Sequence, residues 1–145
     1  TGNTQGSTIY YNQETGTDQV NAGNIATAIP AFIESGDFDI TQKRSNTGQA
    51  VGTPDLRGDG EYIMRISRFI PDFITQTGDT KVSFTTRAYP NSTPAVKEFT
   101  INSSKTFQST RIRARSVALK ISNTAVNQDW KLGTFRLDIA PGGLR

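Results

Sequence analysis

Three arginines spaced two residues apart are the most distinctive charged side chains in this sequence. Arg111, Arg113 and Arg115 lie in a run, Thr110 to Ser122, that has the alternating pattern of a strand. In one extended strand a period of two turns all three side chains to the same side, about 7 Å apart. Because like charges repel, we expect this row to meet carboxylates, phosphates or a partner surface, to which guanidinium groups are suited. The pattern is also typical of a solvated face that protects a strand edge.

Contact between this row and a nucleic acid would not depend on base sequence. Neither a recognition helix nor an aromatic stacking platform accompanies the arginines, so direct reading of bases is not expected. Contact with DNA phosphates would be non-specific and would weaken steeply with salt.

Acidic residues supply the other candidate chemistry. Glu34, Asp37, Asp39 and Glu61 could provide the carboxylate pair of a glycoside hydrolase. The chain has thirteen acidic residues, however, and no motif singles out two of them. It has neither His nor Cys, which excludes Ser-His-Asp triads, thiolate metal sites and His-dependent zinc chemistry. We predict that the protein is not an enzyme and holds no cofactor or metal.

A polar stretch, Thr41 to Gly60, is expected to be an exposed contact loop, because long unstructured loops are usually functional or disordered. Arg57 and Asp59 flank a glycine, as in the tripeptide of integrin ligands, although Gly-Asp-Gly is also ordinary turn chemistry. With Tyr62 just after the loop, these two residues form the predicted contact site.

Residues of this region also bear on two other kinds of binding site. The cluster of Asp55, Asp59 and Glu61 lacks calcium-loop spacing, because Arg57 occupies the middle ligand position. A carbohydrate- or receptor-binding module remains an alternative function, with exposed aromatic rings such as those of Tyr62 and Tyr89 at its site.

The basic character is concentrated near the end of the chain. The net charge is +3, and residues 111–145 contribute +5 of it through seven basic and two acidic side chains. The first 110 residues therefore carry −2. Nowhere in the chain does an apolar run approach the roughly 20 residues that a membrane-spanning helix needs, so we expect no membrane contact.

Alternating apolar and polar residues, with frequent turn signals, predict strands throughout and no helix. Expected strands are Ala31 to Ile40, Tyr62 to Phe73, Lys81 to Tyr89, Val96 to Asn102 and two C-terminal runs. An all-β fold follows: an antiparallel β-sandwich, Ig-like or jelly-roll-like, with long polar loops. We expect one core over residues 31–145, preceded by a flexible leader with a short edge strand over residues 1–30.

The alternation slips by one residue at two places. Ile112 and Ala114 fall on one parity and Val117 on the other, which predicts a β-bulge near Arg115 or Ser116. A second slip separates Trp130 from Phe135, with Gly133 at the break. We expect both rings in the core and a positive φ at this glycine.

The two C-terminal runs resemble the ends of virion structural proteins of tailed bacteriophages, most closely the tail nozzle or tail tubular type of short-tailed phages. The resemblance lies in Arg-x-Arg-Ala-Arg-x-x-Ala-Leu-x-Ile-Ser (Arg111 to Ser122) and Trp-x-Leu-Gly-Thr-x-Arg-Leu-Asp-Ile-x-Pro-x-Gly (Trp130 to Gly143). Ala31 to Ile40 and Arg65 to Phe73 fit the same pattern, so it covers roughly residues 31 to 143. It departs at Gly142, Gly143 and Leu144, where a more charged segment is expected.

This resemblance implies a structural role in the virion. A tail nozzle of this type forms a homo-oligomeric ring around the channel through which DNA leaves the particle. The partners implied are copies of the same chain, neighbouring tail proteins and, non-specifically, DNA phosphates. Proteins of this type are much longer, so the chain is expected to be one domain of a larger protein.

Overall fold

The computed structural model describes residues 18–20, 26–40 and 62–144 of the chain. Within these ranges the secondary structure is strand, turn and irregular segments, without helix. The strands are β1 (Asp18–Val20), β2 (Ala26–Ala28), β3 (Ala31–Glu34), β4 (Tyr62–Thr77), β5 (Thr80–Arg87), β6 (Ala95–Ile101), β7 (Gln108–Ala114), β8 (Ser116–Asn123) and β9 (Asp129–Leu144).

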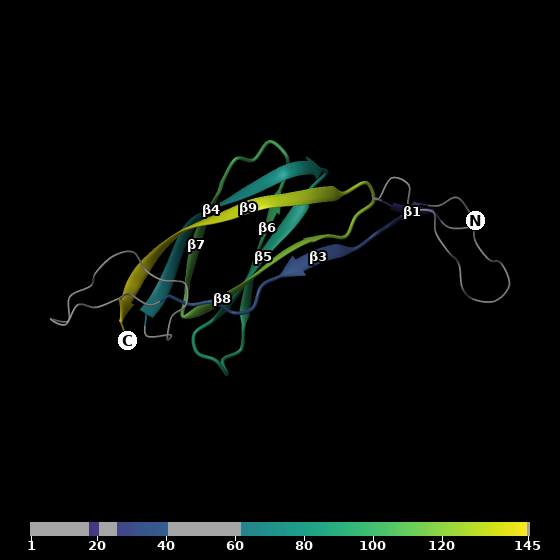
Figure 1. Cartoon of the computed structure of the whole chain (residues 1–145). Coiled ribbons are helices and arrows are strands. Elements are labelled where there is room, and N and C mark those ends of the chain that lie inside the picture. The colour runs from purple at the N-terminus through teal and green to yellow at the C-terminus, as the bar shows by residue number, and fades with distance from the viewer. Residues whose placement is uncertain (1–17, 21–25, 41–61, 145) are drawn as a thin grey trace.

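Two antiparallel sheets form the body of the molecule (Figure 1). One has four strands in the order β3-β8-β5-β6, and the other has three in the order β7-β4-β9. β1 and β2 form a separate two-stranded ribbon within the described residues. The predicted all-β fold with two packed antiparallel sheets is confirmed.

The core lies between the inner faces of these sheets. Phe69 of β4 is fully buried, and its ring centroid lies 5.3 Å from that of Phe84 on β5 and 5.5 Å from that of Phe135 on β9. Val82 on β5 pairs with Ile121 on β8, and both are buried. Burying one such side chain contributes about 1.5–3 kcal/mol, so this layer is the main source of cohesion between the sheets.

The predicted strand from Ala31 to Ile40 is shorter than expected. β3 ends at Glu34, and after the interruption at Gly36 a single bridge joins Phe38 to Val117. Ile40 is nevertheless almost completely buried. This segment therefore contributes to the core without continuing as regular sheet.

The first phase slip is a change of sheet rather than a bulge within one strand. β7 ends at Ala114 in the three-stranded sheet, and β8 begins at Ser116 in the four-stranded sheet. Arg115 lies in the corner between them, where its backbone N–H donates to the Arg87 carbonyl oxygen at 3.0 Å. Such corners are a recognised way for a chain to pass between packed sheets. The prediction of an irregularity here was right, but its interpretation as a bulge was wrong.

The second slip is an irregularity within β9, as predicted. Pro71 faces Phe135 and Phe73 faces Leu132, so β9 uses one more residue than β4 between these pairs. Trp130 and Phe135 are both half-buried and pack against the core. A positive φ is not the reason for glycine, because among the described residues positive-φ glycines are Gly78 and Gly143. Instead, a Cβ at Gly133 would lie 2.6 Å from the Asp72 carbonyl oxygen.

Pro71 marks the point at which β4 becomes an edge strand. Up to Phe69, β4 pairs with β7 on one side and β9 on the other, and beyond it β4 pairs with β9 alone. A proline lacks the N–H that a second neighbour would need, so this position suits it.

Candidate functional site

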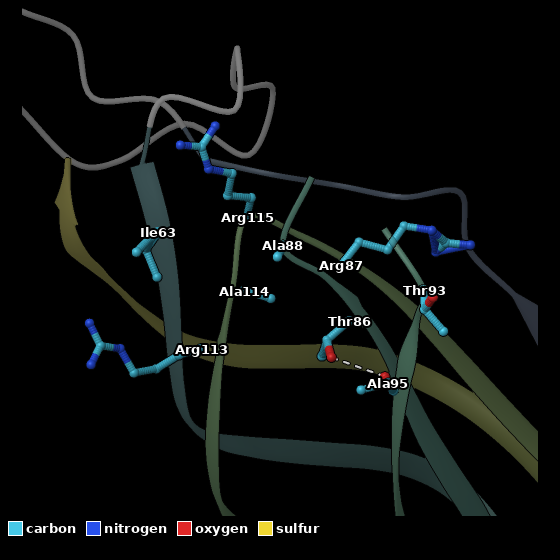
Figure 2. Close-up of a pocket in the computed structure, with 9 residues that line it drawn as sticks. All are labelled: Ile63, Thr86, Arg87, Ala88, Thr93, Ala95, Arg113, Ala114 and Arg115. Carbon is cyan, nitrogen blue, oxygen red and sulfur yellow. Dashed lines mark hydrogen bonds between the residues drawn. The ribbon is translucent and has the colours of Figure 1, made fainter. Parts of the chain in front are cut away.

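Two of the three arginines in the predicted row share one face of β7. Arg111 and Arg113 are exposed, and the alternate residues Thr110, Ile112 and Ala114 are buried. Arg115 does not continue the row, because it lies past the end of β7 in the corner between the sheets. In Figure 2 the guanidinium groups of Arg113 and Arg115 lie well apart. The prediction that all three lie on one strand face was therefore wrong.

A different arginine completes the cationic face. Arg65 of β4 is the direct cross-strand partner of Arg113, and both side chains are exposed. Like charges directly opposite one another destabilise a strand pair, so this arrangement costs stability. Sequence reasoning missed Arg65, because no local pattern shows which residues of β4 and β7 stand opposite each other.

Between these side chains the surface is hollowed. A depression of about 590 Å³ is lined by Arg65, Arg111 and Arg113, together with Thr110, Ile112 and the Ala140 to Gly142 segment of β9. Arg113 donates to the Gly142 carbonyl oxygen at 3.4 Å. We call Arg65, Arg111 and Arg113 the arginine face.

Four other charged residues on this sheet form ion pairs between β4 and β9. The Arg68 Nε lies 2.6 Å from Asp138 Oδ2, and Arg136 pairs with Asp72. Among the residues that the structure describes, no carboxylate pairs with Arg65, Arg111 or Arg113. The arginine face is thus a positively charged area without ion pairs to the described residues, beside an area that contains ion pairs.

A fourth cation adjoins the arginine face from the other sheet. Lys97 of β6 donates to the Arg111 carbonyl oxygen at 2.7 Å. Its ammonium group has no carboxylate partner in the described part of the chain. The positive area therefore extends across the edge where β6 and β7 meet.

A second depression, of about 460 Å³, lies at the end of the sandwich (Figure 2). Arg87, Arg113 and Arg115 contribute to its wall, along with Ile63 and small residues of β5, β6 and β7. The three guanidinium groups diverge in Figure 2, and Arg87 lies 3.4 Å from Asp37. The charged groups around this depression therefore do not converge on one point where a ligand could bind.

Two of the four candidate carboxylates are paired with cations of different strands. Glu34 pairs with Lys120 of β8 at 3.3 Å, and Asp37 pairs with Arg87 of β5. Asp39 is half-buried after β3, and Glu61 lies outside the described residues. In the described ranges no three His, Cys, Asp or Glu residues gather as a metal site would require.

Of the three residues in the predicted contact site, the structure describes Tyr62. Arg57 and Asp59 lie outside the described residues, as does the whole stretch 41–61. Tyr62 is a core residue, 7% exposed at the start of β4, so its prediction as an exposed contact aromatic was wrong. Tyr62 begins β4, and the alternation of this strand turns its side chain inward although a polar stretch precedes it in the sequence. Tyr89, in the turn between β5 and β6, is 60% exposed.

One lateral side of the sandwich is incompletely closed. β3 and β9 are edge strands of their sheets, and each pairs with one neighbour. Ile33 of β3 faces the inner side with its partner Ile121 but is 51% exposed. Phe135, Leu137 and Ile139 of β9 are only half-buried against the core. We call these four residues, with the free edges of β3 and β9, the open side.

Comparison with protein families and with characterised proteins found no match for this chain. The described residues also contain no helix with the length and apolar character to cross a membrane.

Proposed function

We propose that this chain is a structural domain of a phage tail, which works by packing against copies of itself in a ring of the virion. Two things support the proposal. The first is the resemblance of the C-terminal runs to virion proteins of the tail nozzle type. The second, which carries it, is the open side of the sandwich.

The open side has the features of a protein contact. Edge strands offer unpaired backbone N–H and C=O groups, and natural monomers usually blunt or cover them. Here the β3 edge exposes Phe32 at 65% and Ile33 at 51%, with inward apolar side chains of β9 half-buried nearby in the other sheet. Another chain could pair with a free edge and cover these side chains in one contact.

A second copy of the chain suits this side better than a highly charged partner does. Glu34 of β3 pairs with Lys120, and Arg136 and Asp138 of β9 pair with β4. The remaining charges on β9, Asp129 and Lys131, have opposite signs. A surface that is nearly neutral and partly apolar is complementary to another surface of the same kind.

The alternative function, a carbohydrate- or receptor-binding module, rests on fewer residues than the sequence suggested. The burial of Tyr62 removes one of its two aromatic candidates, and Tyr89 is left in the β5–β6 turn. Glycan binding that is lost in Tyr89→Ala would favour this alternative.

Sedimentation velocity at increasing protein concentration tests the proposal. The unmodified chain should form species heavier than its monomer mass of 15.8 kDa. Ile33→Lys should shift the distribution to monomer, because a charge on the edge opposes pairing. Val96→Lys is the matched control, since Val96 is 55% exposed on β6, the other edge of the same sheet.

The proposal fails if the unmodified chain stays monomeric at every concentration, or if both variants assemble as the unmodified chain does. Thermal melting of each variant shows whether it is folded, so that loss of assembly is not confused with unfolding.

A further inference from the structure

The arginine face binds a different kind of partner from the open side. We infer that Arg65, Arg111 and Arg113, with Lys97 beside them, form a contact surface for the phosphate backbone of a nucleic acid. This inference does not depend on the proposed ring, because it follows from the placement of these four cations alone.

The first reason is the cost of the arrangement. Arg65 and Arg113 stand directly opposite each other on adjacent strands, a separation of about 5 Å between Cα atoms. Arg111 lies two residues before Arg113 on β7, about 7 Å from it. Exposed arginines elsewhere on the same sheet avoid this cost by pairing with Asp72 and Asp138. A ligand that brings several negative charges would relieve the repulsion.

The second reason is that the described part of a second copy has few free carboxylates to offer. Glu34, Asp37, Asp72, Glu98 and Asp138 are all in ion pairs within the chain. Over residues 26–40 and 62–144 the acids without an ion pair are Asp39, Asp79 and Asp129, on three separate segments. The arginine face therefore matches an external polyanion better than it matches the described surface of another copy.

The third reason is the shape of the surface. The guanidinium groups come from two adjacent strands around an open depression of about 590 Å³ rather than from a closed cage. Phosphates of a DNA strand follow one another about every 3.4 Å along the helix axis, so the span from Arg111 to Arg113 covers about two intervals. The lining of the depression contains no aromatic ring, which fits contact with the backbone and not stacking on bases.

Fluorescence anisotropy with a short labelled DNA duplex of arbitrary sequence, titrated at several salt concentrations, measures this binding. If three phosphates are neutralised, the logarithm of the binding constant should fall with the logarithm of salt with a slope of about −2.7. Arg65→Gln should reduce the magnitude of that slope by about 0.9, and the triple change of Arg65, Arg111 and Arg113 to Gln should remove most binding.

Arg68→Gln and Arg136→Gln are the matched controls. Both arginines belong to the same sheet but are paired with carboxylates, so neither change should alter the slope. A second duplex with a different sequence should bind equally well, because phosphates carry no sequence information.

Three results would overturn the inference. One is the absence of duplex binding at low salt. Another is equal binding by the triple variant and the unmodified chain. The third is binding of poly-glutamate with no binding of the duplex, which would identify an acidic protein as the partner. None of these results bears on assembly through the open side, which Ile33→Lys tests separately.

Discussion

At the residue scale, the atoms that surround a position explain which side chain stands there better than the sequence pattern does. Gly133 illustrates this, because its place at a phase slip predicted the irregularity of β9 but not the reason for glycine. The carbonyl oxygen of Asp72 occupies the space that a Cβ would need. The site is thus a close approach between strands rather than a left-handed backbone position.

Gly133→Ala should destabilise the protein by about 1–3 kcal/mol, since either β4 or β9 must move to admit the methyl group. Gly36→Ala is the control, because a Cβ there would meet no atom within 4 Å. Urea denaturation followed by tryptophan fluorescence measures both changes. Equal stability of the two variants would show that the close approach does not hold in solution.

Thr110 is a buried polar residue whose role was not visible in the sequence. Its hydroxyl donates to the Ile66 carbonyl oxygen at 2.7 Å, where the pairing of β4 shifts register. Thr110→Val keeps the shape but leaves that carbonyl without its partner, which should cost about 1–3 kcal/mol.

The same denaturation experiment tests this cost. Thr100→Val, at an exposed position on β6, should change stability by less than about 0.5 kcal/mol. An equal effect of the two substitutions would mean that the Thr110 hydrogen bond contributes little.

At the element scale, alternation located most strands, and non-local pairing decided the rest. The strands from Tyr62, Lys81 and Val96 were placed nearly as observed, because apolar and polar residues alternate over part of each. That β7 and β8 belong to different sheets could not be seen. A phase slip looks the same in sequence whether the strand bulges or crosses to the opposite sheet.

The candidate site was predictable to the same extent. Arg111 and Arg113 share a face because alternation within one strand is local. Arg65 joins them only through the pairing of β4 with β7, and its partner lies 48 residues further along the chain. One sequence carries no sign of such a register. Tyr62 was misplaced because a polar stretch precedes it in the sequence, although its strand turns it inward.

Unequal pairing of the strands predicts unequal protection of their amides. β5 has a neighbour on each side over nearly its whole length, whereas among the described residues β1 and β2 pair with each other over three residues. Two-stranded ribbons alone are marginally stable. Native-state hydrogen exchange should therefore be slowest at Val82 to Thr85 and much faster in β1 and β2.

Exchange measured residue by residue by NMR checks this ordering. Protection of Gln19 equal to that of Phe84 would contradict it.

At the scale of the whole molecule, the two sheets leave surfaces of different chemistry. The open side, at β3 and β9, is partly apolar and nearly neutral. The arginine face, on β4 and β7, is positive and unpaired. We propose that the first packs against another copy and that the second contacts nucleic-acid phosphates. Such a division would suit the proposed ring around DNA.

Contact between copies through the open side is the central claim, and photo-crosslinking tests it most directly. The chain has no Cys, so Ile33→Cys provides a single thiol for a benzophenone label on β3. Mixing labelled chains with isotope-labelled chains separates inter-chain from intra-chain products by mass spectrometry. Val96→Cys on β6 is the control. We predict inter-chain products from position 33 and few from position 96. Products that are only intra-chain from position 33, or equal inter-chain yields from both positions, would contradict the proposed assembly.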